Sequence, residues 1–274
     1  MKALSDTIGH IAPPRPRPQR RFATARAIFA LILREMSTTY GRSPGGYVWE
    51  VLQPVGGIAL LSIVFSYAFR SPPIGTSFAL FYATGFIVLS HFNGLNQKMG
   101  IAIRFSKPLL TYPNVTLMDA ILARFLLNTL TSFLVFIILM TGIVTMFDLR
   151  IILDLPEIFK AWAMLTALSF GVGILNCFLM SMFPVWQQVW QILTRPLFIV
   201  SGIFFLIDNL PATYRDILLY NPVAHVIMQM RAGFYATYEA PLVSPVYVYL
   251  ISLVCAVSGV LLLHRYHRMI IDER

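Results

Sequence analysis

The sequence predicts an all-α membrane protein with six transmembrane helices, an N-terminal amphipathic helix at the membrane interface and short re-entrant helices before the last span. Apolar residues make up 57% of the chain and charged residues only 12%, with a mean hydropathy of +0.72. An ordinary soluble domain is about one quarter charged, so this chain has too few charges to cover a water-facing surface. Its apolar runs also reach the ~20 residues that a helix needs to cross a bilayer.

Six apolar stretches have the length of a span. They run approximately over Leu52–Phe69, Phe78–Gln97, Leu117–Met146, Ile158–Phe183, Trp186–Ile207 and Val246–His264. We expect residues 47–274 to form one six-span domain. Residues 1–21 are basic and interrupted by prolines, which predicts a flexible tail near an anionic leaflet.

The distribution of basic residues predicts the orientation. A net charge of +9 would favour a nucleic-acid partner in a soluble protein. Here the lysines and arginines gather at the N-terminus, between Lys98 and Lys107, and at the C-terminus, whereas the opposite loops hold few. The positive-inside rule therefore places both termini in the cytoplasm and predicts an even number of spans, with no nucleic-acid partner.

Residues 22–40 have the periodicity of an amphipathic helix. One face would carry Phe22, Ala25, Phe29, Ile32, Leu33, Met36 and Tyr40, and the other Ala27, Arg34, Glu35 and Thr38. Such a helix is expected to lie along the cytoplasmic interface with its apolar face inward. The alternative is a packed helix of a small cytoplasmic domain.

The segment 208–240 is predicted to lie on the outer side as two short helices that dip back toward the membrane. Asn221 can cap the second helix, and Pro222 fits its first position. Non-helical backbone between such helices is tolerable only where protein or water covers it, which favours the mouth of a pathway.

A bend is predicted between the interfacial helix and the first span, because glycines and a proline cluster over residues 41–46. Arg42 lies in this bend, and Tyr47 and Trp49 follow it at the depth of the lipid headgroups. The bend is either a hinge that gates access from the cytoplasm or a simple turn with an aromatic belt.

Four residues inside the predicted spans are candidates for ligand contact. Arg124 and Arg195 would be costly in lipid unless they pair, meet water or snorkel, and an anionic ligand in a watery path would supply a partner. Trp186 and Trp190 are four residues apart among glutamines, so they could line a glycan path. An interfacial aromatic belt is the alternative for the tryptophans, and snorkelling for the arginines.

Several chemistries are excluded or disfavoured. No glycine is followed by lysine, so the chain has no Walker A phosphate loop, and any ATPase must be another chain. Neither a metal-ligand motif nor a nucleophile elbow is present, so no catalytic residue, metal or cofactor is expected. A membrane-embedded glycosyl or acyl transferase would need paired carboxylates, for which only Asp119 and Glu50 are available. A passive channel would need a filter motif, which is missing.

A set of short motifs resembles one transporter family. The motifs are Ala30–Met36, Tyr40–Arg42, Gly46–Trp49, Leu52–Pro54, Asp119–Arg124, Arg195–Pro196, Ser201–Phe205 and Tyr220–His225. Together they resemble the ABC-2-type polysaccharide export permeases, and most closely those of the KpsM-type capsular polysaccharide group, which have type V exporter transmembrane domains. The resemblance covers nearly all of the chain from Ala27 onward.

This resemblance implies an assembly and a cargo. It implies a homodimer in the bacterial inner membrane with two cytoplasmic KpsT-like ABC ATPase subunits, which bind ATP and magnesium. It also implies a periplasmic KpsE-like co-polymerase and an outer-membrane export channel, with a lipid-linked acidic polysaccharide as cargo. Another cargo, such as O-antigen, teichoic acid, a lipid or a drug, remains the alternative.

The resemblance also assigns roles to segments. Residues 22–40 would be the gate helix, and the loop 100–116 would carry a helix that couples to the ATPase through Arg104, Phe105, Ser106, Lys107, Pro108 and Leu109. Independently of these roles, we expect Arg42 and the basic loop residues to recruit the phosphate of a lipid-linked cargo, because cationic side chains bind phosphates. One departure concerns the helix after Pro222, where the family usually carries an acid and this chain has Met228. The role of that acid is either lost or moved, for example to Gln229.

Overall fold

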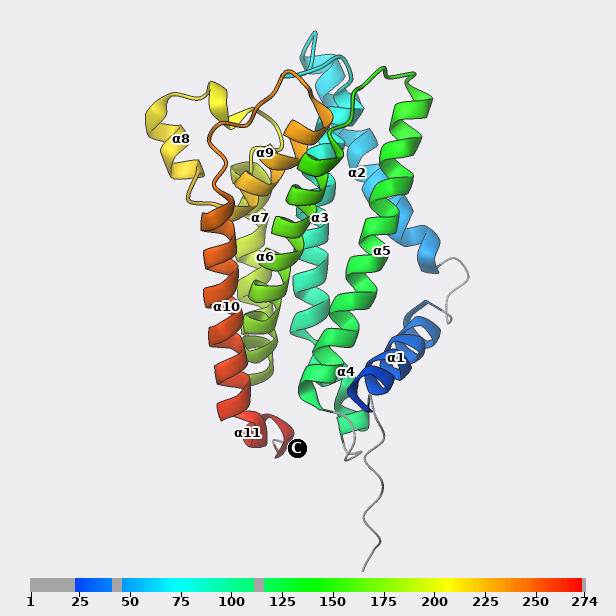
Figure 1. Cartoon of the computed structure of the whole chain (residues 1–274), viewed down its shortest axis with the longest axis vertical. Coiled ribbons are helices and arrows are strands. Elements are labelled where there is room, and N and C mark those ends of the chain that lie inside the picture. Colours follow the sequence, from blue (N-terminus) through cyan, green and yellow to red (C-terminus); the bar gives the residue numbers. More distant parts are fainter. Residues whose placement is uncertain (1–22, 41–45, 111–115, 273–274) are drawn as a thin grey trace, which may run out of the picture.

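The computed structural model describes residues 23–40, 46–110 and 116–272 and is all-helical in that part of the chain (Figure 1). Five of the described helices are long and apolar enough to cross a membrane. They are α2 (Gly46–Ala68), α3 (Phe78–Gly100), α5 (Leu117–Met146), α6 (Leu155–Met182) and α10 (Pro245–Arg265). These confirm five of the predicted spans.

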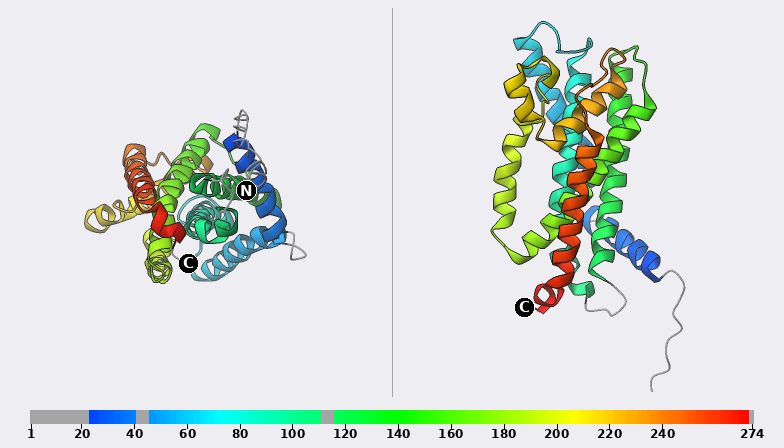
Figure 2. Two further views of the ribbon diagram at one scale, coloured as in Figure 1. Left: turned by 90° about the horizontal axis from the view of Figure 1, so that it is seen from below. Right: turned by 60° about the vertical axis from the view of Figure 1, so that its left-hand side comes forward.

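Helices α3 and α6 form the centre of the bundle. Within the most apolar stretch of each helix, the buried share of residues is 72% in α3 and 61% in α6. The corresponding share is only 17% in α2 and 22% in both α5 and α10. Seen from below, α3 lies near the middle, with the other long helices around it (Figure 2). The outer helices therefore present apolar surface that only lipid or another protein can cover.

Small residues allow α6 and α10 to pack closely. A Cβ atom on Gly171 would lie 2.1 Å from the carbonyl oxygen of Ser252, and one on Gly259 would lie 2.7 Å from the amide nitrogen of Leu175. Close backbone approach at small residues is typical of helix pairs in membranes. Glycine is therefore required at both positions.

Helix α7 (Trp186–Val200) ends seven residues before the predicted end of the fifth span. Gly202 follows it with a φ of +76°, which breaks the helix, and the 3-10 turn η2 (Ile207–Asn209) comes next. A helix of 15 residues is about 22 Å long, which is shorter than a bilayer core of ~30 Å. The prediction of one continuous helix to Ile207 is therefore wrong.

Short helices cover the two ends of the bundle (Figure 1). We call one end of the bundle the base. It carries α1 (Ala23–Glu35), the π-helical turn η1 (Met36–Tyr40), α4 (Ala102–Leu110) and α11 (His267–Asp272). The top carries η2, α8 (Ala212–Leu218) and α9 (Pro222–Phe234). Helix α6 ends at the base and α8 lies at the top, so α7 connects the two ends (Figure 2).

The two short helices predicted around Asn221 are confirmed. The Asn221 side chain accepts a hydrogen bond from the amide of Val223 at 3.0 Å, and Pro222 occupies the first turn of α9. Nearly every residue of α9 is buried, so this helix packs into the bundle instead of lying on its surface.

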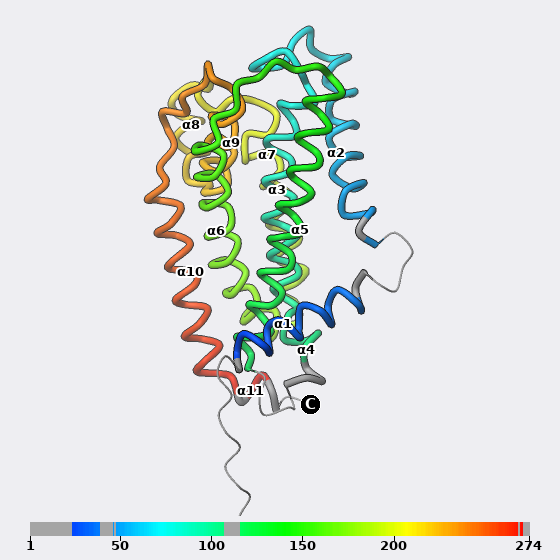
Figure 3. Tube along the Cα trace, turned by 45° about the vertical axis from the view of Figure 1, so that its right-hand side comes forward, coloured from blue at the N-terminus to red at the C-terminus, as the bar shows by residue number. Residues whose placement is uncertain are grey.

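Helix α1 confirms a helix in the predicted segment 22–40, but its burial differs from the predicted one, and its position at a membrane interface stays a prediction. It lies obliquely across the base, against α5 (Figure 3). Glu35 is only 6% exposed, whereas the apolar Phe29 and Leu33 are 62% and 51% exposed. The assignment of Glu35 to the outward face is wrong, because Arg124 of α5 supplies it with a buried partner.

Candidate functional site

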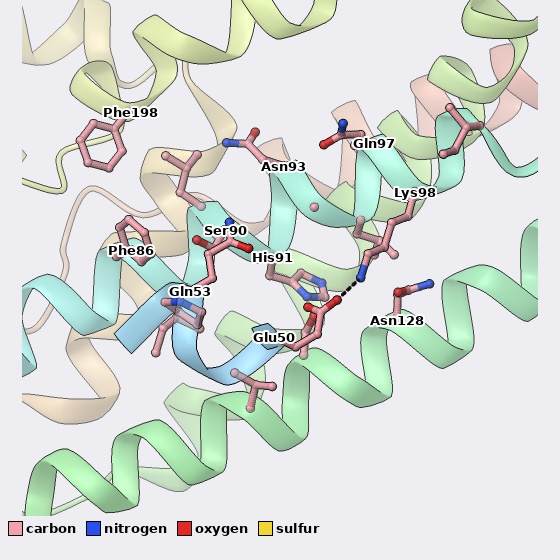
Figure 4. Close-up of a pocket in the computed structure, with 18 residues that line it drawn as sticks. Glu50, Gln53, Phe86, Ser90, His91, Asn93, Gln97, Lys98, Asn128 and Phe198 are labelled. Atoms are coloured by element: carbon pink, nitrogen blue, oxygen red, sulfur yellow. Dashed lines mark hydrogen bonds and ion pairs between the residues drawn. The ribbon is translucent and has the colours of Figure 1, made fainter. Parts of the chain in front are cut away.

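A polar cavity of about 590 Å³ lies between α2, α3, α5 and α7 (Figure 4). Its polar lining consists of Glu50 and Gln53 from α2, Ser90, His91, Asn93, Gln97 and Lys98 from α3, and Asn128 and Ser132 from α5. Polar groups inside apolar spans are costly unless they face protein or water. So many of them around one space make this cavity the candidate functional site.

Helical spacing creates the polar lining. Ser90, Asn93 and Gln97 follow one another at intervals of three and four residues, which places them on one face of α3. Glu50 and Gln53 share a face of α2 in the same way. None of these five was among the residues predicted for the site, although the polar spacing within residues 78–97 was a usable signal.

An ion pair joins two walls of the cavity. The Nζ atom of Lys98 lies 2.7 Å from Oε1 of Glu50, and each side chain is 33% exposed (Figure 4). Lys98 is near the end of α3 and Glu50 near the start of α2. The pair therefore ties these two helices together on the side of the cavity nearest the base.

Two lining residues carry buried polar atoms that make no hydrogen bond within the described part of the chain. These atoms are Oδ1 of Asn93 and both ring nitrogens of His91, whose ring packs edge-on against Trp162 with 5.2 Å between centroids. An unsatisfied buried polar atom costs about 1–3 kcal/mol. Ligand groups such as hydroxyls can instead be hydrogen-bonded by the polar side chains that reach the cavity surface, such as Gln97.

Arg124, a predicted cargo contact, is turned into the protein. Its Nε atom lies 3.1 Å from Oε1 of Glu35, and its Nη1 donates to the carbonyl of Lys98 at 2.7 Å. The guanidinium carbon also lies 4.1 Å from the centre of the Phe105 ring. Pairing is therefore how this chain accommodates the charge, and contact with cargo stays a prediction.

Trp186 and Trp190 both face the bundle and tie α7 to it. The indole nitrogen of Trp186 donates a hydrogen bond to Oδ1 of Asn176 at 3.0 Å. The side-chain amide nitrogen of Asn176 in turn donates to Oδ1 of Asn96 at 3.4 Å. The Trp190 ring packs against Phe92 of α3, with 6.4 Å between centroids. The predicted shared face is confirmed, while a role in cargo contact stays a prediction.

The other predicted contact residues are dispersed. Trp49 is 65% exposed on α2. Arg195 is exposed on α7 and forms no ion pair with any described residue. Arg42 lies outside the described residues, and Tyr47 lies in α2 with a side chain that is also outside them. Their roles stay predictions.

The six residues predicted to couple to an ATPase all fall within α4. The Nη2 of Arg104 donates to the carbonyl of Met180 at 3.5 Å, Phe105 lies under Arg124, and Ser106 is buried. The side chains of Lys107, Pro108 and Leu109 and the whole of residues 111–115 lie outside the described part. A short helix in this loop is therefore confirmed, and its contact with an ATPase stays a prediction.

Met228, where an acid was expected, is buried in a small apolar cluster with Ile207 and Ala224. The neighbouring Gln229 donates from Nε2 to Oε2 of Glu157 on α6. A carboxylate therefore does lie beside this helix, and it is supplied by another element of the fold.

Comparison with known proteins decides the family. The sequence model of the ABC-2 type transporter family matches residues 26–235 of this chain. The chain belongs to this family. It is 31% identical to the polysialic acid transport protein KpsM of Escherichia coli, over 85% of this chain and 90% of that protein.

Other relatives of this ABC-2 protein carry similar names. The capsule polysaccharide export inner-membrane protein CtrC of Neisseria meningitidis serogroup B is 24% identical over 89% of this chain and 92% of its own. BexB of Haemophilus influenzae, with the same description, is 30% identical over 78% of this chain and 83% of its own. The chain is thus an ABC-2 membrane permease. No nucleotide-binding family was found in it, and membership implies a partner ATPase subunit.

Proposed function

We propose that this permease exports a lipid-linked acidic capsular polysaccharide across the inner membrane of a bacterium, driven by ATP hydrolysis in a partner subunit. The observation that carries this proposal is the polar cavity among otherwise apolar spans, in a chain whose relatives are named for polysialic acid or capsule polysaccharide transport. A sugar polymer presents hydroxyls and carboxylates. The side-chain amides, the serine hydroxyls and the Lys98 ammonium group that line the cavity can hydrogen-bond both kinds of group.

The proposed topology has six crossings and both termini in the cytoplasm, so the base of the bundle is the cytoplasmic side. Helix α7 supports the sixth crossing, because the chain passes through it from the base to the top. The residues after Val200 would complete the crossing as a non-helical segment. Such a segment is acceptable in a membrane because protein covers it, and Ser201 and Ile203 are fully buried.

The proposed assembly is a homodimer with two KpsT-like ATPase subunits that hold ATP and magnesium. Helix α4 would meet the ATPases at the base, and the top would face a KpsE-like co-polymerase and, beyond it, an outer-membrane channel. The extensive exposed apolar surface of α2 and α7 is consistent with a second copy or lipid against them.

In this mechanism ATP binding closes the two ATPases, moves α4 and opens a path between the protomers. Arg42 and the other basic residues at the base recruit the phosphate of the lipid-linked polymer. Amides such as Asn93 and Gln97 then hydrogen-bond successive sugars. These contacts have to be weak and numerous, because a tight site would stop a moving chain.

The two carboxylates available to the transferase alternative both make other contacts in the structure. The Asp119 side chain accepts a hydrogen bond from the amide of Thr116 in a capping box at the start of α5, and Glu50 pairs with Lys98. Both acids are thus committed to structural contacts.

Deletion of the gene in the bacterium that encodes this chain tests the proposed cargo. We expect loss of surface capsule together with accumulation of the polysaccharide inside the cell, and recovery from a plasmid-borne copy. An intact capsule would contradict the proposal. Loss of O-antigen or teichoic acid with an intact capsule would assign the permease to that cargo instead.

A further inference from the structure

The side chain of Arg124 contacts three helices near the base, namely α1, α4 and the end of α3. The guanidinium extends from α5 and contacts the Glu35 carboxylate of α1, the Phe105 ring of α4 and the Lys98 carbonyl of α3. Helices α1 and α4 also meet directly, because the guanidinium carbon of Arg34 lies 6.0 Å from the centre of the same Phe105 ring. We call this arrangement the Arg124 clasp.

The clasp is buried and therefore resists separation. The Arg124 side chain is 6% exposed and that of Glu35 is 8% exposed. Removing one partner of a buried ion pair leaves an uncompensated charge, which is strongly unfavourable. A variant without Arg124 therefore leaves Glu35 buried without its cation, and we expect α1 to separate from α5 more readily in it.

Arginine suits this position in a way that lysine does not. Its extended guanidinium lies 3.1 Å from the Glu35 carboxylate through Nε, while its central carbon lies 4.1 Å from the centre of the Phe105 ring. A lysine ammonium is a point charge and cannot hold both contacts in the same geometry. The clasp thus depends on the shape of the side chain as well as its charge.

The clasp also connects to the cavity. The carbonyl of Lys98 accepts the hydrogen bond from Arg124, while the side chain of Lys98 pairs with Glu50 of α2. A shift of Arg124 therefore displaces the end of α3 and, through the same residue, the ion pair that joins two walls of the cavity.

We propose that Arg124 is a positioning residue that transmits movement of α4 to the gate helix α1 and to the cavity. The proposal rests on the proposed function where it assigns α4 to the ATPase contact, α1 to a gate and the cavity to the transport path. In this account α1 and α4 move as one unit, and Arg124 acts from inside the protein instead of touching cargo. Without Arg124, ATP is still hydrolysed but less polysaccharide is moved for each ATP.

The clasp can be tested first on the purified full-length chain, without any ATPase. Hydrogen–deuterium exchange reports how often the amides of α1 become exposed. We expect Arg124→Met to speed exchange across Ala23–Glu35 by at least tenfold and Glu35→Gln to speed it less. The matched control Arg195→Met, which removes an exposed arginine from another span helix, should leave exchange in α1 unchanged. Unchanged exchange in Arg124→Met would overturn the clasp.

The coupling role is tested in the complex with its ATPase, reconstituted in vesicles. We expect Arg124→Met to keep ATP hydrolysis but to lower the polysaccharide moved per ATP by at least tenfold, with Arg124→Lys intermediate. The swap of Glu35→Arg with Arg124→Glu, which restores an ion pair, should recover part of both the ratio and the protection of α1. If Arg124→Met does not fold, Arg124→Lys and Glu35→Gln give the same comparison.

The two readouts separate the possible failures. A normal ratio of transport to hydrolysis in a variant with exposed α1 would show that the clasp is only structural and would overturn the positioning role. A wild-type complex that moves no polysaccharide would instead contradict the proposed function, while the exchange result would still decide whether the clasp exists.

Discussion

Lys98 of α3 and Glu50 of α2 form an ion pair, with 2.7 Å between Nζ and Oε1, at the wall of the polar cavity. Both side chains are one-third exposed, so water screens the pair and its net contribution to stability is small. A cationic group that lines a polar space can also attract an anionic polymer. We therefore expect the pair to contribute more to transport than to folding.

The substitution Lys98→Gln tests this distinction. We expect the rate of polysaccharide transport in vesicles to fall several-fold, because the cavity loses its cationic group, while the free energy of unfolding changes by about 0–1 kcal/mol. Lys160→Gln is the matched control, since it breaks the Lys160–Glu157 pair of α6, which does not line the cavity. Equal losses of transport in the two variants would argue against a role for Lys98.

Asn93 and Asn96 offer a comparison within one helix. Asn93 lines the cavity with an unpaired Oδ1, whereas Asn96 is buried and hydrogen-bonded to Asn176. We expect Asn93→Leu to lower transport with little effect on the melting temperature. Asn96→Leu should destabilise the protein by about 1–3 kcal/mol, because Asn176 loses a buried partner. Similar melting temperatures combined with similar transport in both variants would contradict this assignment.

Glu35 predicts a pH dependence of stability. Burial raises the pKa of Glu35 above its ordinary value of 4.5, and the nearby Arg124 offsets only part of this effect. The folded protein therefore binds a proton at Glu35 more readily than the unfolded chain does. This stabilisation grows as the pH falls through the raised pKa and is complete below about 4.5.

The measurement is the melting temperature of the wild type minus that of Glu35→Gln, recorded from neutral pH down to about pH 4.5. We expect this difference to become more positive as the pH falls, because the variant lacks the titrating group. A difference that becomes more negative would mean that the Arg124 pair lowers the pKa and outweighs burial.

Gly202 is required where α7 ends. Its φ of +76° is in the left-handed region, and a Cβ atom there would lie 2.9 Å from the Ile207 side chain. We expect Gly202→Ala to destabilise the protein by about 1–2 kcal/mol in a chemical denaturation measurement. Gly142→Ala, about one turn before the end of α5 and with open space around it, should be neutral or slightly stabilising. Equal effects would mean that the turn after α7 tolerates a side chain.

The long helices could be predicted from the sequence because their signals are local. Length and apolarity gave five spans, and the predicted bounds Leu117–Met146 agree with those of α5. The cap at Asn221 was also readable, since an asparagine followed by proline specifies the start of a helix within two residues. Periodicity likewise identified a helix before the first span, but not the face that it buries.

Other features depend on contacts between distant segments. Nothing near Glu35 in the sequence shows that Arg124, on another helix, will bury it. Arg231 falls in the segment 208–240 that was predicted to lie on the outer side, and it is fully buried and donates to the carbonyls of Ile203 and Phe205 at 3.0 and 3.1 Å. Its position follows from the way α9 packs into the bundle, which no local pattern specifies.

The cavity is an intermediate case. Ser90, Asn93 and Gln97 stand out as polar residues within a predicted span, so one wall could have been predicted from spacing alone. The opposing Glu50 and Gln53 could not be placed, because the sequence does not fix which face of α2 meets α3. A site formed by several helices is therefore only partly visible before the fold is known.

Transport in reconstituted vesicles tests the central claim most directly. The permease and its ATPase subunit are placed together in vesicles, and the acidic polysaccharide that becomes protected from a glycan-degrading enzyme is measured. We predict protection that requires both ATP and the ATPase subunit. Protection of the same polymer by the permease alone, without nucleotide, would contradict the account.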